Sequence, residues 1–287
     1  MIRSITFVFF MCALALRGDV VSVSTFLALE LKREGEPKLA AVEMRRLGMM
    51  EELPVAEQAG FFWASAFLYK QAGIYEIADS MLNEVENRMP SWTDHPLMLR
   101  AEIAGARGRT RESSFYWDSL LRGANDESQD VLARRRLAAI RLAERDLDGA
   151  RHLLSGSPIN EDERIAYLDT FEAGRDKNPR VGGLLGMIPG MGYAYAGEYA
   201  NAFRSLLLNS LFIFGMVDTA RNNHWGGFAV ITFFEITWYS GSIYGGIDAS
   251  HRYNKRRMQV ALDGIAGESG FEPDWEQIPG IQLRYRF

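Results

Sequence analysis

The chain has 287 residues, a net charge of −5 and an apolar fraction of 47%. This length suits one large domain or two modest ones, and the acidic balance argues against nucleic acid as a partner, because binding phosphate needs a basic surface. The apolar residues are unevenly placed: residues 20–173 are charged and helix-favouring, whereas residues 181–246 are rich in glycine, aromatic and aliphatic side chains. The sequence therefore predicts a soluble part followed by a membrane part.

The start of the chain has the order of a secretory signal peptide. Arg3 supplies a positive charge, residues 5–14 form an apolar run too short to span a bilayer, and Ala13-Leu14-Ala15 is an A-x-A cleavage site. We predict a signal peptide over residues 1–15. Its removal takes away Cys12, the one cysteine of the chain, and with it any disulfide, thiol nucleophile or cysteine metal site. The alternative is an N-terminal anchor that stays attached.

Residues 20–173 predict helix after helix, arranged as a repeated hairpin. In three copies a glycine turn is followed five residues later by a small residue, and a degenerate fourth copy is centred on Ala150. The three pairs are Gly35 with Ala40, Gly73 with Ala78, and Gly108 with Ser113. The small residues are 38, 35 and 37 residues apart. A period in the mid-thirties is typical of a helical solenoid, in which stacked helical pairs share a core that one pair cannot bury alone.

Six residues of the second copy stand at regular offsets: Gly73, Tyr75, Ala78, Leu82, Val85 and Pro90. This pattern resembles that of tetratricopeptide repeats, and the resemblance covers about residues 20–157. The other copies depart from it, since Pro54 comes two residues late, Ser113 replaces alanine and Arg145 stands where glycine is expected. The resemblance implies a right-handed superhelix whose concave groove binds peptides or protein partners, and it implies no chemistry.

Two aromatic clusters are candidates for lining such a groove. They are Phe61-Phe62-Trp63 with Tyr69, and Phe115-Tyr116-Trp117. Consecutive helical residues point in different directions, so at most one or two members of each cluster share a surface. The candidate groove residues are Trp63, Tyr69, Tyr116 and Trp117. The alternative, which we favour for most of them, is packing between repeats.

A polar linker over residues 174–180 precedes the predicted membrane module, residues 181–258. Residues 200–220 and 225–246 are apolar runs, each long enough to cross a hydrocarbon core, which needs about 20 helical residues. A tight polar turn joins them. The runs therefore predict a transmembrane helical hairpin in an otherwise all-α chain, followed by a tail over residues 259–287.

Glycines are regularly spaced in this module. Gly182, Gly186 and Gly190 recur every four residues, and Gly241 and Gly245 form one G-x-x-x-G. This spacing lets helix backbones approach closely and also allows homo-oligomers to form through these helices. A proline inside the first series predicts a short, interrupted helix.

The most distinctive motif precedes the first apolar run. It consists of Pro189, Gly190, Gly192, Tyr195 and Gly197, in the order P-G-x-G-x-x-Y-x-G. It resembles the entry signature of a family of small two-helix bacterial membrane modules, and the resemblance covers about residues 181–255. Such modules are often attached to exported repeat domains. The resemblance implies architecture and says little about activity.

Polar residues interrupt the apolar runs: Arg204 and Asn209 in the first, Glu235 in the second. A carboxylate near the centre of a membrane helix is costly unless it is neutral or paired, so Glu235 is expected to face a partner: Arg204, Asn209, His251 or a backbone break near Pro189. The functional interpretation is an ion or proton site, or an assembly contact. The structural interpretation, which we favour, is a buried hydrogen bond that locks the hairpin.

Two signals for orientation conflict. The hairpin's outer flanks are basic whereas its turn holds only Arg221, which would place the flanks in the cytoplasm. The signal peptide would place the repeats outside, and we follow it and expect a periplasmic repeat domain in a bacterial cell envelope. The choice between inner and outer membrane stays open. Residues 281–287 alternate and end in Phe287, similar to the closing strand of outer-membrane barrels. One strand cannot form a barrel, so we expect a short strand or docking peptide.

No motif predicts catalysis, a metal or a cofactor. The four histidines lie in different elements, and metalloprotease, hydrolase, phosphate-loop and dinucleotide motifs are missing. Asp248 and His251 are one helical turn apart but lack a nucleophile. We therefore expect a membrane-anchored envelope scaffold or assembly factor, not an enzyme, whose groove binds an envelope protein or peptide. The alternative is a membrane-active module, such as a pore, transporter component or insertion aid, that uses the glycine-rich hairpin and Glu235.

Overall fold

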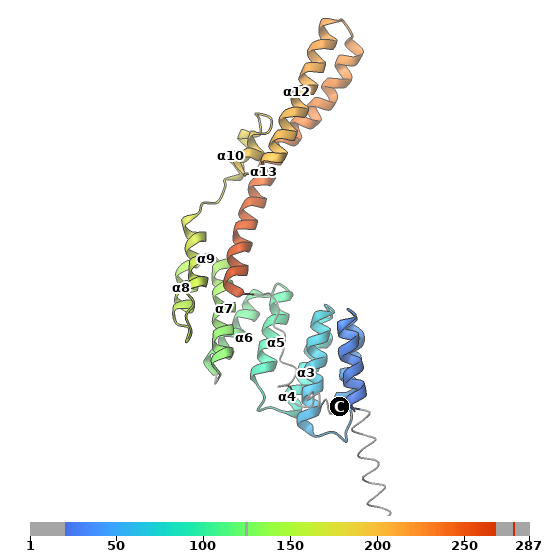
Figure 1. Cartoon of the computed structure of the whole chain (residues 1–287), viewed down its shortest axis with the longest axis vertical. Helices are drawn as coiled ribbons and strands as arrows, with labels where there is room; N and C mark the ends of the chain where they lie inside the picture. The colour runs from blue at the N-terminus through green and yellow to red at the C-terminus, as the bar shows by residue number, and fades with distance from the viewer. Residues whose placement is uncertain (1–20, 124–125, 268–277, 279–287) are drawn as a thin grey trace, which may run out of the picture. The chain divides into compact units, whose positions relative to one another are not determined.

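The computed structural model describes residues 21–123, 126–267 and 278, and the regular elements within them are α-helices (Figure 1). The predicted all-α class is confirmed for this part of the chain. A helical segment over residues 21–33 comes first. It is followed by α2 (Pro37–Gly48), α3 (Val55–Gln71), α4 (Tyr75–Arg88), α5 (Asp94–Ala106), α6 (Thr110–Gly123), α7 (Glu127–Ala143), α8 (Leu147–Ser155), α9 (Asp162–Ala173), α10 (Pro179–Leu185), α11 (Met191–Tyr195), α12 (Tyr199–Arg221) and α13 (Trp225–Ala266).

The chain divides into two compact units. The N-terminal unit comprises residues 1–140, 157–159 and 269–287, and the C-terminal unit comprises residues 141–156 and 160–268. The division falls near the end of α7, ahead of the polar stretch 174–180 that the sequence suggests as a linker. The predicted signal peptide and the alternating tail over 281–287 lie outside the described residues.

Four helical hairpins turn through the same backbone conformation. Positive φ angles of 84°, 73°, 71° and 67° occur at Gly35, Gly73, Gly108 and Arg145. At the second turn, the N–H of Gly73 donates to the carbonyl of Lys70 (3.0 Å), and the next N–H donates to the carbonyl of Tyr69 (2.9 Å); the other turns repeat this pair of bonds. This is the Schellman arrangement that ends a helix and satisfies its last carbonyls. Arg145 adopts it even though a side chain in this conformation costs about 1–2 kcal/mol.

The small residue that follows each turn is buried where two helices meet. Ala40, Ala78, Ser113 and Ala150 all lose their contact with solvent. Ser113, the one polar member, donates its hydroxyl to the carbonyl oxygen of Ala101 in the preceding helix (2.9 Å). The period predicted from the sequence is therefore present in the helices, which is compatible with a helical solenoid.

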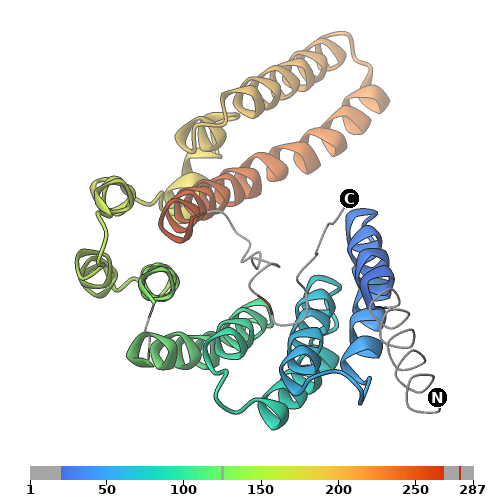
Figure 2. The same ribbon diagram turned by 60° about the horizontal axis from the view of Figure 1, so that its bottom comes forward.

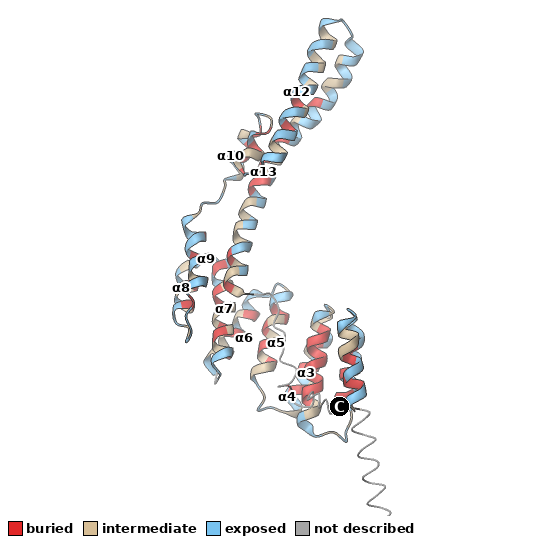
Figure 3. Cartoon of the chain, viewed as in Figure 1, coloured by how far each residue is buried: buried red, intermediate tan, exposed pale blue. Residues whose placement is uncertain are grey.

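The core of the N-terminal unit is centred on α3, which packs against α2, α4 and α5 (Figure 3). Trp63 is 0% exposed and stacks on Phe67, with ring centroids 5.9 Å apart. Tyr69 and Trp117 are buried as well, and Tyr116 is half-buried. The proposed groove lining by Trp63, Tyr69 and Trp117 is thus wrong. Neighbouring helices cover every face of the part of α3 that carries Trp63 and Tyr69, whereas on α6 Trp117 lies on the buried side and Phe115 on the exposed side.

The C-terminal unit is organised along α13, a helix of 42 residues. In chain order, α9, α10, α11 and α12 all pack against it. The views in Figures 1 and 2 agree that α12 runs beside the N-terminal half of α13. The sequence predicted a helix ending near residue 246 and a tail from residue 259. The helix instead continues to Ala266, because α9 packs on its last turns and holds them in the fold.

Candidate functional site

The hairpin formed by α12 and the first half of α13 is the part of the structure with the longest apolar helical segments. Among the described residues, α12 is the one helix long and apolar enough to cross a membrane. The second predicted span, residues 225–246, does not meet the same criterion, because Glu235 and the run Thr237–Ser242 lower its apolar content. A membrane span is therefore supported for one of the two predicted segments.

The hairpin has an inverted distribution of polarity. Phe214 on α12 is 69% exposed and Phe233 on α13 is 68% exposed, and thirteen more large apolar side chains of the hairpin are exposed with them. Asn209 is 0% exposed and Glu235 is 7% exposed, both on the seam between the helices. Water-soluble proteins show the opposite arrangement, with apolar side chains inside and charged ones outside.

Polar side chains follow one another along this seam. The hydroxyl of Ser205 donates to that of Ser242 (3.2 Å), and Asn209 donates its amide to the carbonyl of Ser205 (2.6 Å). The side-chain oxygen Oδ1 of Asn209 and Oε2 of Glu235 have no hydrogen-bond partner. The predicted pairing of Glu235 with Arg204 is not formed: Arg204 is exposed and reaches Asn201 instead (3.5 Å).

Four glycines let α10, α11 and α13 cross backbone to backbone. A Cβ placed on Gly192 would lie 2.6 Å from the carbonyl oxygen of Gly182 and 2.8 Å from Cα of Gly246. A Cβ on Gly186 would meet the carbonyl oxygen of Ser242 at 2.7 Å. The predicted close packing thus occurs between helices of one chain, and these glycines contact that chain's own backbone.

On α13 the packing residues differ from the predicted pair. Gly241 faces open space, and Gly245 lies against the ring of Tyr193. The close approach is made by Gly246, flanked at four residues on either side by the buried Ser242 and Ser250. The signal was present in the sequence as a small-x-x-x-small pattern. A pattern of glycines alone does not reveal this contact, because two of the three small residues that form it on α13 are serines.

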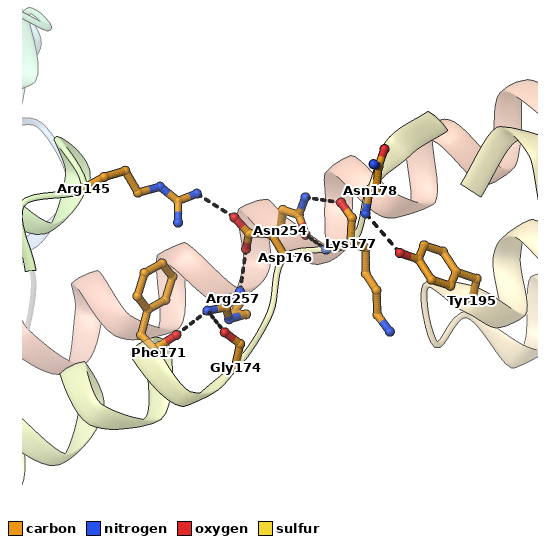
Figure 4. Close-up of polar contacts among 9 residues, drawn as sticks. All are labelled: Arg145, Phe171, Gly174, Asp176, Lys177, Asn178, Tyr195, Asn254 and Arg257. Carbon is orange, nitrogen blue, oxygen red and sulfur yellow. Dashed lines mark hydrogen bonds and ion pairs between the residues drawn. The ribbon is translucent and has the colours of Figure 1, made fainter. Parts of the chain in front are cut away.

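The residues of the P-G-x-G-x-x-Y-x-G motif build the turns around this crossing. Pro189 lies in the turn between α10 and α11. Gly190 has a φ of +84°, and a Cβ placed on it would lie 2.3 Å from the carbonyl oxygen of Ala202. Gly197 has a φ of +80° and begins the turn into α12. The hydroxyl of Tyr195 accepts a hydrogen bond from the N–H of Asn178 (3.1 Å), as Figure 4 shows. The motif is accounted for by chain geometry.

The predicted linker is bonded to α13 along its length (Figure 4). Asn254 accepts from the N–H of Lys177 (2.7 Å) and donates to its carbonyl (2.8 Å), so one side chain satisfies both backbone groups. Arg257 pairs with Asp176 (2.5 Å), whose other oxygen pairs with Arg145 (2.9 Å). These contacts fix the extended segment between α9 and α10 and explain why the units do not divide there.

A charged cluster lies where α12 begins. The guanidinium of Arg252 forms two hydrogen bonds with the carboxylate of Glu198, at 2.9 and 2.8 Å, and also pairs with Asp248. The hydrogen bonds from Arg252 lower the pKa of Glu198 and keep it ionised. Because Asp248 is engaged by Arg252, the pair of Asp248 with His251 considered from the sequence is not formed.

The described residues contain no group of three or more His, Cys, Asp and Glu side chains placed to hold a metal ion. No family model matches the chain, and neither curated proteins nor solved structures give a match.

Proposed function

We propose that the chain is anchored in a lipid bilayer by a transmembrane hairpin, formed by α12 and the first half of α13, and that it acts as a scaffold or assembly factor. The observation that carries the proposal is the inverted polarity of the hairpin. Hydrocarbon accepts exposed apolar side chains, while polar groups such as those of Asn209 and Ser242 are driven to the helix–helix seam.

The dimensions support this placement. With a rise of about 1.5 Å per residue, the 23 residues of α12 extend about 34 Å, close to the ~30 Å of a hydrocarbon core. Exposed aromatic side chains lie at both ends of the hairpin: Tyr199, Trp238 and Tyr244 towards its entry and Trp225 beside its turn. Tyrosine and tryptophan favour the membrane–water interface.

The helical repeats support the partner-binding half of the proposal. The four positive-φ turns are 38, 35 and 37 residues apart, close to the period of about 34 in tetratricopeptide repeats. We propose that the repeats form a tetratricopeptide-like surface that binds an envelope protein or peptide. Within the two candidate aromatic clusters, the residues that are not buried are Tyr116 and the exposed Phe115, whose rings pack at 5.7 Å.

Alkaline extraction of membranes tests the anchor. The chain should remain in the membrane pellet after a carbonate wash. Replacing Leu211 and Phe233 together by arginine should release it, since each charge at mid-membrane depth costs about 2.5–3.5 kcal/mol. The matched control replaces Val42 and Phe115, equally exposed apolar residues of the N-terminal unit, and should stay in the pellet. Release of the wild-type chain would refute the anchor.

Crosslinking in intact membranes tests the scaffold. A photoreactive residue at position 115 should capture one defined protein, and Tyr116→Ala should weaken that capture. The same probe at the exposed Val55 serves as the control and should not capture that protein. Equal capture from both positions would contradict a specific repeat surface.

A second candidate function, a membrane-active module such as a pore, transporter component or insertion aid, is favoured by one observation. Glu235 is buried in the seam, and its Oε2 has no hydrogen-bond partner. Glu235→Gln keeps the shape and removes the ionisable group. Loss of cellular function with partner capture unchanged would favour the membrane-active module, and an unchanged phenotype would favour the scaffold.

A further inference from the structure

We propose that a cavity at the entry end of the hairpin binds the phosphate of an anionic phospholipid headgroup. The inference rests on the membrane anchor proposed above. The cavity has a volume of about 500 Å³ and opens between α12 and α13. Its lining includes Tyr193, Asn201, Arg204, Trp238, Ser242 and Arg252.

The two guanidinium groups of the cavity are not equivalent. Arg252 is neutralised by Glu198 and Asp248, with which it forms ion pairs. Among the described residues, Arg204 forms no ion pair, and its one hydrogen bond, to Asn201, is 3.5 Å long. Arg204 is therefore the guanidinium of this cavity that no carboxylate of the described residues contacts.

The position of Arg204 makes this charge unusual. It lies five residues into α12, about 7.5 Å along the helix axis from Tyr199, and so inside the candidate membrane span. An unbalanced charge at that depth is unfavourable unless it reaches the interface or meets an anion. A headgroup phosphate is an anion present at that level, and a guanidinium binds phosphate through parallel N–H donors.

The other lining groups suit the same ligand. The hydroxyls of Tyr193 and Ser242 are polar groups able to donate to phosphate oxygens. The amide of Asn201 already donates to Glu198 (2.7 Å) and accepts from Arg204. Exposed apolar side chains flank the cavity, Phe203 and Leu207 on α12 and Trp238 on α13. They would contact acyl chains, which a free phosphate ion does not have. The cavity thus fits a phospholipid and not inorganic phosphate.

The test uses the full chain, purified in detergent and delipidated, with bound lipid measured by native mass spectrometry. The wild-type chain should retain phosphatidylglycerol about fivefold over phosphatidylcholine, the effect of one basic residue at a membrane surface. Arg204→Gln should remove this preference, and Arg204→Lys should keep part of it. Arg221→Gln, at the other exposed end of the same helix, is the matched control and should keep all of it.

Three results would overturn the proposal. They are equal retention of both lipids by the wild type, an unchanged preference in Arg204→Gln, and displacement of phosphatidylglycerol by an equal concentration of inorganic phosphate. Alkaline extraction of the same variants separates this inference from the anchor. A chain that stays in the membrane without lipid preference contradicts only the headgroup site, whereas a chain released from the membrane contradicts the anchor.

Discussion

Gly182 and Gly246 meet backbone to backbone: a Cβ on Gly246 would lie 2.3 Å from the carbonyl oxygen of Gly182. The contact joins α10 to α13 through two residues more than 60 positions apart in sequence, and α11 crosses at the same point through Gly192. The atoms nearest to a Cβ on Gly246 are all backbone, so no side chain there could rotate away and the crossing depends on residues without a Cβ.

Gly246→Ala should therefore destabilise the C-terminal unit. We expect a loss of about 1–3 kcal/mol, typical of overpacking a tight contact. Thermal unfolding in detergent, followed by circular dichroism, measures it. Gly241→Ala is the control on the same helix; its Cβ would enter open space, and alanine favours helix. Equal effects of the two substitutions would show that the crossing is not tight.

Trp63→Ala tests whether this side chain is core or groove. Because Trp63 is completely buried, we expect the N-terminal unit to lose about 3–5 kcal/mol of stability. Phe115→Ala, at an exposed position, should change it by less than about 0.5 kcal/mol. Urea unfolding measures both. A small effect at Trp63 would restore the groove interpretation.

His95 should make the N-terminal unit sensitive to mild acid. Burial lowers the pKa of His95, opposed in part by Asp94 and Asp126, and Trp92 donates its indole N–H to the ring nitrogen Nδ1 (3.2 Å), which requires a neutral ring. The unfolded chain then binds the proton more tightly than the folded one. Stability is complete above the unfolded pKa of about 6.5 and is lost as the pH falls through that value towards the lowered folded pKa.

Urea midpoints at pH 7.5 and 5.5 measure this effect. His95→Phe should flatten the difference between the two pH values, whereas His152→Phe, at an exposed position, should preserve it. A wild-type midpoint that does not change with pH would rule out a buried neutral imidazole.

Asn254→Leu should release the segment between α9 and α10. The substitution leaves the N–H and carbonyl of Lys177 without their partner, a loss of about 1–3 kcal/mol. Trypsin should then cut after Arg175 and Lys177 faster than in the wild type. Gln259→Ala, which removes only an exposed contact with Asp263, should leave the cleavage rate unchanged. Equal rates in all three proteins would mean that the segment is not held by α13.

The hairpin repeat could be predicted because each copy carries its own local signal. A glycine turn and a small residue five positions later determine the turn at Gly73 and the helix crossing at Ala78, whatever the rest of the chain does. Even the fourth turn, which has Arg145 in place of glycine, adopts the same conformation. The side chain of Arg145 pairs with Asp176 at 2.9 Å, and no local sequence pattern predicts this contact.

The candidate site was less predictable because it depends on contacts between distant segments. Spacing showed that Trp63 lies on a helix but not that helices cover all of its faces. It indicated a close approach near Gly245, but the next residue, Gly246, makes it. The burial of Glu235 against α12 could be expected from its depth in an apolar run, whereas its missing hydrogen bond could not.

The anchor is tested most directly by the reactivity of single cysteines. In a chain with Cys12→Ser, cysteine replaces Phe214, Phe233 or Phe115, whose exposed fractions in the isolated fold are 69%, 68% and 61%. In lipid nanodiscs, N-ethylmaleimide should label position 115 rapidly and positions 214 and 233 far more slowly, because thiolate forms only in water. Labelling of all three at the same rate would contradict a hairpin embedded in the bilayer.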